Sequence, residues 1–502
     1  MSWWLIILPG EGGASEGIEQ ALKRSIDLAI NHSPLALAVH RHNHPDAKHE
    51  VADVWDIKPD TATGGQPVGL CWFSPDCRHH SRAKGGRPVS KSVRGLTWVA
   101  ARWAATVKPR VIVIENVKEI LEWGPLRKEA DGKIRPCLIR KGQTFRAFTR
   151  TLKRHGYALE WRVLKACDYG TPTIRERFFL VARRDGRPIV WPKPTHAAPD
   201  SLAVKRGKLK PWRTAAECID WSTPTTSIFG RPKPLVDATL RRIASGVQRY
   251  VLQNPKPFIV KLNHTASYYK AFRGQSLGSP LQTITTSPGF ALASPTLVPM
   301  HEGALSHEDE KNAQRVAAFL EAYAPASAAL KRDAAQPVTD TATTPLEQQM
   351  AAFMLNMKGS QRQARDIRHP LSTICAGSTH AYVTVAFLAP YYGNGSGLTG
   401  RDITAPMPTI TTKDRLKLVT VTLDGETYAL VDIGIRMLQP YELAKAQGFP
   451  LGYEFAEIDG KKIAKNKQVQ LIGNSVPPPL ARAIAEANFT HEQKFTASLV
   501  AA

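Results

Sequence analysis

The first 190 residues alternate short apolar runs with longer stretches whose apolar residues recur at helical spacing. The apolar runs predict strands at Trp3–Leu8, Ile26–Ile30, Val68–Phe73, Val111–Glu115 and Phe178–Arg183. The stretches between them predict helices at Ser15–Leu22, Pro34–His42 and Leu96–Val107. Strands that alternate with helices are typical of a parallel sheet covered on both faces. The sequence therefore predicts a doubly wound α/β domain over residues 1–190.

The composition of the sequence changes after Pro192, where prolines, threonines and serines become frequent and long stretches with helical spacing become rare. This composition predicts a separate, irregular or β-rich module over residues 191–430. Within it, residues 302–346 are rich in alanine and mixed in charge, which predicts an inserted helical segment. Helical spacing returns from about residue 431, so residues 431–502 are expected to complete the first domain.

An apolar residue followed by a polar stretch and then Pro-x-x-Thr-Ile occurs three times in the second region. The copies run over Phe258–Thr286, Phe353–Ala376 and Phe387–Thr412. Repeated units of this length are typical of short β-structures. The spacing differs among the copies, so a chance similarity of Pro- and Thr-rich hairpins is the alternative.

The chain carries a formal net charge of +24 over 502 residues. From Lys193 to Arg273 there are 15 Lys and Arg against 4 Asp and Glu, so the excess is concentrated there. Cations that neutralise phosphates release condensed counterions, which makes nucleic acid the expected partner. A solvated basic surface without a partner is the alternative.

Composition narrows the class of protein further. A hydrophobic content of 43% fits a globular chain that buries a core. Six irregularly spaced cysteines predict reduced thiols in a cytosolic protein. The apolar run Trp3–Leu8 is too short to span a bilayer, so no membrane association is expected.

Small and polar residues follow the first and third expected strands. Leu8–Gly17 is rich in glycine and opens a helix, where backbone N–H groups bind a nucleotide-like cofactor. A purely structural turn is the alternative. Asp53 lies where a third strand would place a carboxylate beside an adenine amino group, although for a single Asp an N-cap or turn role is the favoured alternative.

Cys77 lies within Ser74–Ser81, directly after the apolar run Val68–Phe73. Open α/β folds place their sites at this edge of the sheet, and a thiolate there is a nucleophile. Arg78, His79 and His80 favour the thiolate, whereas Asp76 opposes it. A zinc site is the competing interpretation, with Cys71, Cys77, His79 and His80 as its ligands.

Two further groups of polar residues border expected strands. Glu115 and Asn116 end an apolar strand, so Glu115 is either an ion-pair partner or an acid in a shielded pocket. Thr173, Arg175 and Arg177 alternate along the chain at the start of a strand. The two arginines therefore share one face and are expected to bind an anion or a base edge. A solvated strand edge is the alternative.

The order of these pieces resembles that of the DNA cytosine-5 methyltransferase family. Leu8–Gly17 resembles the family's cofactor loop, and Ser74–Ser81 aligns without a gap with the motif that carries its nucleophile, which falls on Cys77. Later matches are Arg94-Gly95-Leu96, Glu115-Asn116-Val117, Arg175-x-Arg177, Arg436-Met437-Leu438 through Gln447-Gly448-Phe449-Pro450, and Gly473-Asn474-Ser475-Val476-Pro477. The matches cover both ends of the chain and leave about 200 middle residues as a variable target-recognition region.

The sequence departs from the family pattern at five positions. Asp76 and Arg78 replace a proline and a glutamine beside the nucleophile, and Thr173 replaces a glutamine. Leu8 replaces a phenylalanine that stacks on adenine, and Asn31 replaces an acidic residue that holds the ribose hydroxyls. These changes affect cofactor affinity and base contact rather than the groups that make and break bonds.

The resemblance implies a Rossmann-like domain that binds S-adenosylmethionine, followed by a target-recognition domain. The catalytic residues that it implies are Cys77, Glu115, Asn116, Arg175 and Arg177. The implied cofactor-binding residues are Leu8, Gly10, Gly12, Gly13, Asn31, Asp53, Asn474 and Ser475. The residues expected to bind DNA are Arg78, Ser81, Thr173, Lys205, Arg206, Arg241, Arg242 and Arg273.

The implied reaction is methylation of carbon 5 of a flipped-out cytosine in a specific DNA sequence, through a covalent bond from Cys77 to carbon 6. We expect double-stranded DNA as the partner, a monomer, no metal, and a place in the cytoplasm of a bacterial or phage-infected cell. Protection of DNA from restriction is the expected role. The rivals are a transfer-RNA cytosine-5 methyltransferase, an inactive DNA-binding relative and a zinc-dependent nucleic-acid-binding module.

Overall fold

The computed structural model describes residues 2–7, 12–76, 94–128, 132, 134–248, 258–261, 274–286, 289–299, 305–324, 354–356, 363–365, 385–388, 419–423 and 426–492. Contacts divide the chain into two compact units. Unit 1 comprises Met1–Cys218, Pro280–Ser287 and Gln439–Ala502, and unit 2 comprises Ile219–Ser279 and Pro288–Leu438. Each unit is described by itself.

Unit 1 is built on a seven-stranded mixed sheet with the order β3-β2-β1-β4-β5-β9-β8. Its strands are β1 (Trp3–Ile7), β2 (Leu28–Asn31), β3 (Lys48–Val51), β4 (Val68–Phe73), β5 (Val111–Asn116), β8 (Ala158–Lys165) and β9 (Glu176–Arg183). The strands from β1 to β5 are parallel, which confirms the predicted parallel sheet in this part. The chain crosses outward from β1 in both directions, so the carboxyl ends of β1 and β4 flank a topological switch point.

The predicted parallel sheet is mixed at one edge, because β9 runs antiparallel to both β5 and β8. Only ten residues separate the end of β8 from the start of β9, which is too short for a helical crossover. The amino end of β9 therefore lies at the same edge of the sheet as the carboxyl end of β5. This reversal brings Arg177 to the strand end that carries Glu115.

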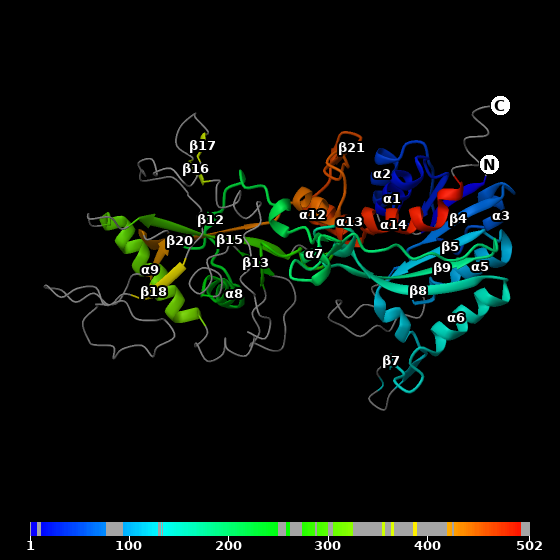
Figure 1. The fold of residues 1–502 in the computed structure, drawn as a ribbon, viewed down its shortest axis with the longest axis horizontal. Coiled ribbons are helices and arrows are strands. Elements are labelled where there is room, and N and C mark those ends of the chain that lie inside the picture. The colour runs from blue at the N-terminus through cyan, green and yellow to red at the C-terminus, as the bar shows by residue number, and fades with distance from the viewer. Residues whose placement is uncertain are drawn as a thin grey trace. The chain divides into compact units, whose positions relative to one another are not determined.

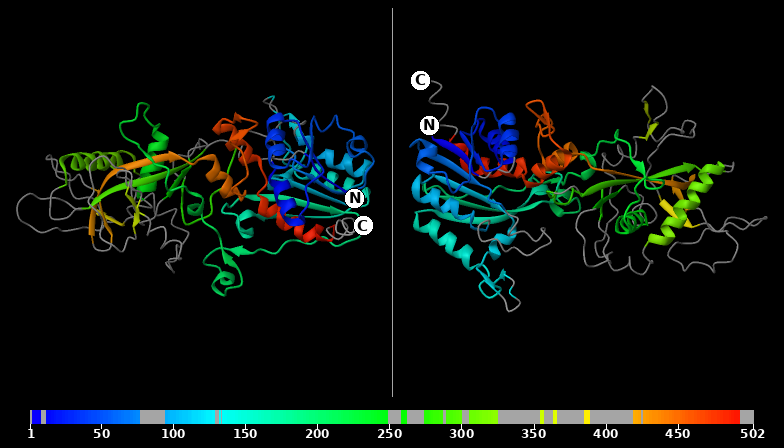
Figure 2. Two further views of the ribbon diagram at one scale, coloured as in Figure 1. Left: turned by 90° about the horizontal axis from the view of Figure 1, so that it is seen from above. Right: turned by 180° about the vertical axis from the view of Figure 1, so that it is seen from behind.

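Helices cover both faces of the sheet, as Figures 1 and 2 show. On one face, α1 (Gly13–Leu22) packs along α14 (Pro478–Phe489), so the two ends of the chain share one apolar core. On the other face, α5 (Trp98–Thr106) and α6 (Gln143–Arg154) pack on a second core that contains Trp103 and Phe148. The predicted helices are confirmed here within two residues at each end.

Unit 1 contains several shorter elements. The helices and turns are α2 (Pro34–Asn43), α3 (Pro59–Thr63), α7 (Leu202–Lys205), α12 (Pro440–Gln447), α13 (Lys465–Asn474), η2 (Lys118–Glu122), η3 (Ala166–Tyr169), η4 (Ala215–Cys218) and η6 (Thr490–Glu492). The small strand pairs are β6 (Leu126–Lys128) with β7 (Ile134–Pro136), β10 (His196–Ala197) with β11 (Lys210–Pro211), and β21 (Glu457–Ile458) with β22 (Lys461–Lys462).

Unit 2 contains an antiparallel sheet with the order β14-β13-β15-β20-β19-β18, and β12 pairs with β20. The strands are β12 (Thr226–Ser227), β13 (Phe258–Lys261), β14 (Gly274–Ser276), β15 (Phe290–Pro299), β18 (Val385–Leu388), β19 (Val419–Leu423) and β20 (Glu426–Met437). The helices α8 (Asp237–Val247) and α9 (His307–Tyr323) contribute to its apolar core. A further strand pair joins β16 (Met354–Asn356) to β17 (Gln363–Arg365).

The described part of the expected insert 302–346 contains the helix α9, and residues 325–346 lie outside the described residues. The first copy of the predicted repeat is partly described, with a strand at its start and the segment Pro280–Thr286 at its end. Most of the second and third copies lies outside the described residues. The repeat therefore stays a prediction.

Candidate active site

Glu115 and Arg177 form an ion pair at the carboxyl edge of the unit 1 sheet. The distance from Arg177 Nε to Glu115 Oε1 is 3.0 Å, and the two side chains are only 10% and 8% exposed. Arg177 Nη1 also donates to the carbonyl of Glu176 at 2.8 Å. Of the two roles that the sequence left open for Glu115, the structure therefore shows an ion-pair partner, and the pair is largely shielded from solvent.

Asn116 holds the turn that leads toward Cys77. Its side chain is 1% exposed, and Nδ2 donates to the carbonyl of Pro75 at 3.1 Å. Its Oδ1 accepts from the backbone N–H of Val117 at 2.9 Å. The backbone N–H of Ser74 donates to the carbonyl of Ile7 at 3.2 Å, which ties the same turn to β1. The chain is thus fixed two residues before Cys77.

Cys77, Arg78 and Ser81 lie outside the described residues, as do Leu8, Gly10 and Arg273. The zinc interpretation also depends on undescribed residues, because Cys77, His79 and His80 are among them. Cys71 is described, and burial in β4 raises its pKa well above the ordinary value. Among the described residues, no group of three or more His, Cys, Asp or Glu is arranged to hold a metal ion.

Three of the predicted cofactor residues, Gly12, Gly13 and Ser475, lie together in the structure. Gly12 is the N-cap of α1. Its φ of 90° is a backbone conformation that strains L side chains. The N–H of Gly13 donates to Ser475 Oγ at 3.1 Å, and a Cβ on Gly13 would lie 2.1 Å from the carbonyl oxygen of Val476. The glycine turn and the Asn474-Ser475-Val476 turn therefore pack directly against each other.

The carboxyl ends of β2 and β3 supply two further predicted residues. Asn31 is 7% exposed, and its Oδ1 accepts from the N–H of Ser33 at 2.9 Å. Asp53 is exposed and accepts from the N–H of Trp55 at 2.9 Å, which is the turn role left open by the sequence. Asn474 is exposed as well. The exposed amide of Asn474, next to the Ser475 that contacts the start of α1, fits the polar groups of an amino-acid nucleoside such as S-adenosylmethionine.

Thr173 and Arg175 are buried rather than exposed. Thr173 is fully buried, pairs with Leu281 in an isolated parallel bridge, and donates from Oγ1 to the carbonyl of Gln282 at 3.5 Å. Arg175 is 1% exposed, and its Nη1 donates to the carbonyl of Ile284 at 2.9 Å. The two residues therefore bind the backbone of a segment that lies more than 100 positions later in the chain.

That segment is Pro280–Thr286, which we name the docking segment. Two backbone hydrogen bonds of 2.8 Å join Leu281 to Pro172 and Ile174. At its other end, Gly473 approaches closely enough that a Cβ there would lie 2.4 Å from the carbonyl oxygen of Thr285. The docking segment thus links the start of β9 to the end of α13 within unit 1.

The remaining residues expected to bind DNA lie in both units. Lys205 and Arg206 are exposed at the end of α7 in unit 1. Arg241 is exposed on α8 in unit 2, with its guanidinium carbon 5.7 Å from the ring centroid of Tyr323, and Arg242 is half-buried next to it.

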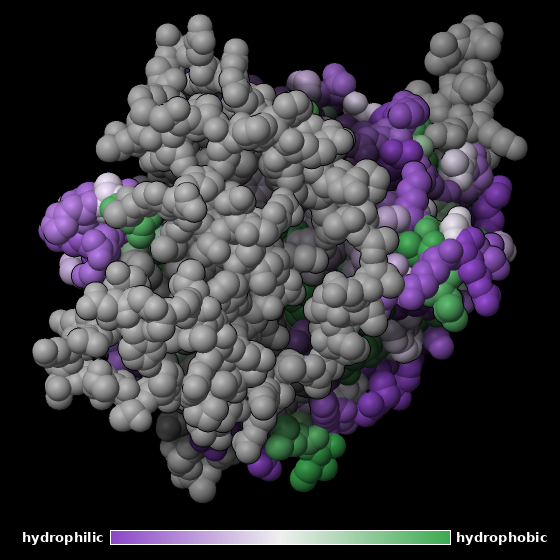
Figure 3. Space-filling model, turned by 60° about the vertical axis from the view of Figure 1, so that its left-hand side comes forward, coloured by the Kyte–Doolittle hydropathy of each residue, from purple (hydrophilic) through white to green (hydrophobic). Residues whose placement is uncertain are grey.

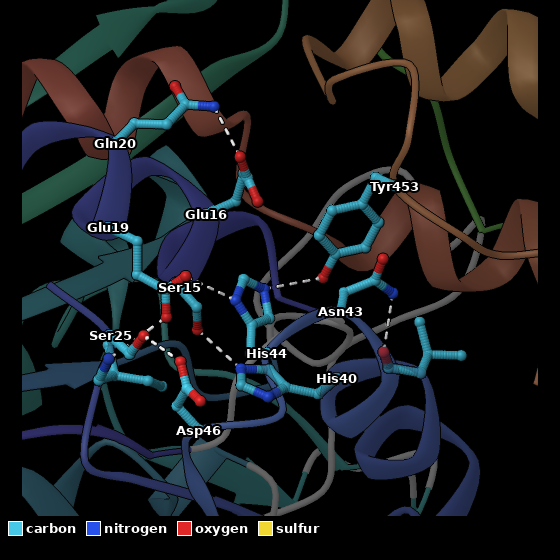
Figure 4. Close-up of polar contacts among 12 residues, drawn as sticks. Ser15, Glu16, Glu19, Gln20, Ser25, His40, Asn43, His44, Asp46 and Tyr453 are labelled. Atoms are coloured by element: carbon cyan, nitrogen blue, oxygen red, sulfur yellow. Dashed lines mark hydrogen bonds and ion pairs between the residues drawn. The ribbon is translucent and has the colours of Figure 1, made fainter. Parts of the chain in front are cut away.

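Sequence reasoning missed a histidine cluster that packs against α1 (Figure 4). His40 is fully buried, with Nε2 2.7 Å from Ser15 Oγ and Nδ1 2.7 Å from His49 Nε2. His44 lies 2.9 Å from Glu19 Oε2 and 3.2 Å from the hydroxyl of Tyr453. The crowding of histidines between positions 40 and 49 was the one available signal.

Burial lowers the pKa of His40 well below its ordinary value, and His44 and His49 act in the same direction. Burial also lowers the pKa of His49, with a further contribution from Arg41. A neutral imidazole has one donor and one acceptor nitrogen, so His40 links Ser15 to His49 in one continuous hydrogen-bond chain. These hydrogen bonds join α1 to α2 and β3 through the side chain of His40.

No helix in the described part of the chain has the length and apolar character needed to cross a membrane. The likeness to solved structures is low: DNMT2 of Spodoptera frugiperda and the Dnmt2 methyltransferase of S. pombe give TM-scores of 0.44. Their identities to this chain are 13% and 14%, with 96% and 97% of this chain covered and 98% and 96% of theirs.

Among curated proteins, the Type II methyltransferase M.AquIA of Picosynechococcus sp. is 27% identical over 229 residues, which cover 44% of this chain and 88% of that protein. The Type II methyltransferase M1.HphI of Haemophilus parahaemolyticus is 26% identical, over 38% of this chain and 49% of that protein. M.AgeI of Thalassovita gelatinovora is 28% identical, over 37% of this chain and 41% of its own length.

The family model for C-5 cytosine-specific DNA methylases matches residues 7–211 and 325–490. The matched ranges contain Glu115, Arg177 and Ser475, which are described above, and also the position of Cys77. They cover well over half of the chain, from the first strand to the last long helix. The chain therefore belongs to the C-5 cytosine-specific DNA methylase family.

Proposed function

We propose that this protein is a DNA (cytosine-5-)-methyltransferase that transfers a methyl group from S-adenosylmethionine to carbon 5 of a flipped-out cytosine in a specific duplex sequence. The shielded Glu115–Arg177 pair is the observation that carries the proposal. Glu115 lies at the end of β5. The next residue, Asn116, holds the backbone of Pro75, two residues before Cys77. A nucleophile, an acid and a cation thus come from adjacent strands at one edge.

The reaction begins with the cytosine ring, whose carbon 5 is a poor nucleophile while the ring is aromatic. The thiolate of Cys77 adds to carbon 6, and the Glu115 carboxyl group, in its protonated form, donates a hydrogen bond or a proton to N3 and takes any transferred proton back when the product forms. The ring electrons then localise as an enamine at carbon 5. Arg177 holds the Glu115 carboxyl group in place and contributes positive charge beside the base.

Bound S-adenosylmethionine supplies an electrophilic methyl group to carbon 5. Gly12, Gly13, Asn31, Asp53, Asn474 and Ser475 would hold it, with Leu8 and Gly10 completing the loop. A base, such as a water molecule, then removes the proton from carbon 5. The bond from carbon 6 to sulfur breaks, and the Cys77 thiolate is released.

The buried contacts of Arg175 and Thr173 lead us to assign them a positioning role in place of direct base or DNA contact. Both side chains hold the docking segment, and Arg177 lies two residues further along the same strand. By fixing the start of β9, Thr173 and Arg175 would keep Arg177 in position to pair with Glu115.

We further propose that residues 191–430 form the target-recognition domain, and that Lys205, Arg206, Arg241, Arg242 and Arg273, with Arg78 and Ser81 near the nucleophile, contact DNA. Residues 1–190 and 431–502 would form the catalytic domain. The curated relatives are named as Type II methyltransferases, which supports a role in protecting DNA from restriction in a bacterial or phage-infected cell.

Bisulfite sequencing of plasmid DNA tests the proposal, in a host that lacks its own cytosine methylation. The wild-type chain should protect cytosines in one sequence context, and Cys77→Ala should protect none. Cys218→Ala is the matched control, because Cys218 is a buried thiol in η4 that is assigned no chemistry, and it should retain the wild-type pattern. Soluble wild-type protein that protects no cytosine would overturn the proposal.

A further inference from the structure

A short basic arm projects from unit 1 between η2 and α6. Within its residues 126–142, the structure describes 126–128, 132 and 134–142, which contain the strand pair β6–β7 followed by the turn Leu138–Lys141. The sequence of residues 126–142 contains six Lys and Arg but only two Asp and Glu. Figure 1 shows β7 extending beyond α6, away from the sheet of the same unit.

The turn of the arm exposes two adjacent aliphatic side chains. Leu138 is 79% exposed and Ile139 is 88% exposed, although single exposed aliphatic residues on protein surfaces are common. On the face drawn in Figure 3, most described residues are hydrophilic and the hydrophobic ones form small separate groups. An adjacent exposed pair followed directly by the exposed cations Arg140 and Lys141 is therefore a distinct feature.

The turn is held firmly to the rest of the unit. The N–H of Cys137 donates to the carbonyl of Pro125 at 2.9 Å, and Cys137 is buried. Gly124 packs so closely that a Cβ there would lie 2.3 Å from the carbonyl oxygen of Arg140. Gly142 begins α6 with a φ of 74°, which turns the chain sharply after Lys141. The exposed pair is thus presented on an anchored turn.

The arm also lies at the edge of the sheet that carries the active site. It follows β5, which ends with Glu115 and Asn116, after only the short turn η2. Arg94 Nη2 donates to the carbonyl of Gly124 at 3.0 Å. Arg94 and the turn Leu138–Lys141 therefore both lie against Gly124.

Charge on the arm is mainly positive. Lys141 Nζ lies 2.8 Å from Glu122 Oε1, but both side chains are substantially exposed, at 51% and 39%. Exposed pairs of this kind contribute little and exchange readily with other ions. Arg127 and Lys128 on β6 are exposed as well.

We propose that the basic arm is a second DNA-binding surface, on the catalytic unit and separate from the target-recognition region. Arg127, Lys128, Arg140 and Lys141 bind the phosphates of the duplex that carries the target cytosine. Leu138 and Ile139 contact sugars and base edges in a groove, as aliphatic side chains do in other DNA-binding proteins. The inference rests on the proposed function, because it takes duplex DNA as the substrate.

The salt dependence of DNA binding tests the inference. The affinity of the full-length protein for a duplex oligonucleotide is measured by fluorescence anisotropy over a range of KCl concentrations. Replacing the four arm cations with Gln should reduce the slope of log K against log salt by about 3 to 4, since each phosphate contact contributes roughly 0.9. Replacing Leu138 and Ile139 with Ser should weaken binding with the slope unchanged.

A matched control removes four cations from the opposite edge of the same unit. Lys108 precedes β5, and Arg150, Lys153 and Arg154 lie toward the end of α6 where the chain returns to the amino edge of the sheet. All four are exposed, so their replacement with Gln should leave the slope within about 1 of wild type. Circular dichroism verifies that every variant is folded.

Two failures are distinguishable. Wild-type protein that methylates DNA, together with an arm variant that keeps the wild-type slope and affinity, would overturn the inference alone. Wild-type protein that neither binds nor methylates duplex DNA would overturn the proposed function, and the inference with it.

Discussion

The Glu115–Arg177 pair is the smallest unit on which the proposed chemistry depends. Removing one partner leaves the other charge shielded from water and unpaired, which costs about 3 kcal/mol in buried pairs. We expect Arg177→Leu to lower the free energy of unfolding by about that amount. Adding Glu115→Gln should restore part of the loss. Urea unfolding of both single variants and the double variant measures the coupling, and additivity within about 0.5 kcal/mol would show that the pair does not interact.

The buried histidine at position 40 gives a pH dependence of stability. Its pKa is lowered in the folded protein, so the unfolded chain binds the proton more readily once the pH falls below about 6.5. Stability from this group is therefore fully present above that pH and is lost as the pH falls, by up to about 1.4 kcal/mol per pH unit.

His40→Gln removes this titration and should flatten the dependence of unfolding free energy on pH between about pH 5 and 6.5. Denaturant unfolding at several pH values measures the slope. His155→Gln is the control, because His155 is exposed at the end of α6. An unchanged slope in His40→Gln would mean that His40 is not the group that resists protonation.

At the scale of elements, the docking segment joins the start of β9 to the end of α13, with Arg175 as its principal tether. Arg175→Gln removes a buried, charged hydrogen bond and should lower the free energy of unfolding by about 2 kcal/mol and reduce kcat. The salt slope of DNA binding should stay unchanged, since a positioning residue contacts no phosphate. A slope reduced by about 1 would instead identify Arg175 as a DNA contact.

Arg184→Gln is the matched control for Arg175, because Arg184 directly follows the other end of β9 and is exposed. Its replacement should change stability by about 0.5 kcal/mol or less and leave kcat unaltered. Equal losses in both variants would show that the effect belongs to the strand as a whole.

Local signals predicted much of the sheet but not its reversal. The strand Val68–Phe73 was predicted with its observed bounds, because a continuous apolar run is bordered by turn residues. The strand β8 was missed because its exposed residues dilute the apolar pattern, and without it the antiparallel direction of β9 was not visible. The docking segment depends on contacts between residues more than 100 positions apart, which no local pattern records.

Local patterns likewise identified some of the site residues, whereas contacts between distant residues determined the environment of others. Glu115 and Asn116 were identified because they end an apolar strand, and motif order supplied the rest of the set. The burial of Thr173 and Arg175 follows from the docking segment, so it could not be read from their alternation. The histidine cluster likewise combines residues from α1, α2 and the turn that contains Tyr453.

At the scale of the whole molecule, the proposed function combines a catalytic unit formed from both ends of the chain with a middle region that reads the target. The basic charge follows this plan, with one concentration over residues 193–273 and another over residues 126–142. Under our proposals, the first serves target recognition and the second holds the duplex beside the flipped cytosine.

Trapping of a covalent complex tests the central claim most directly. Duplex DNA with 5-fluorocytosine at the target position cannot lose a proton from carbon 5, so the bond between Cys77 and carbon 6 should persist after methyl transfer. We expect a denaturation-resistant protein–DNA complex that requires S-adenosylmethionine, forms with wild type and with Cys218→Ala, and is absent with Cys77→Ala. A complex that forms equally well with Cys77→Ala, or no complex from protein that methylates unmodified DNA, would contradict the account.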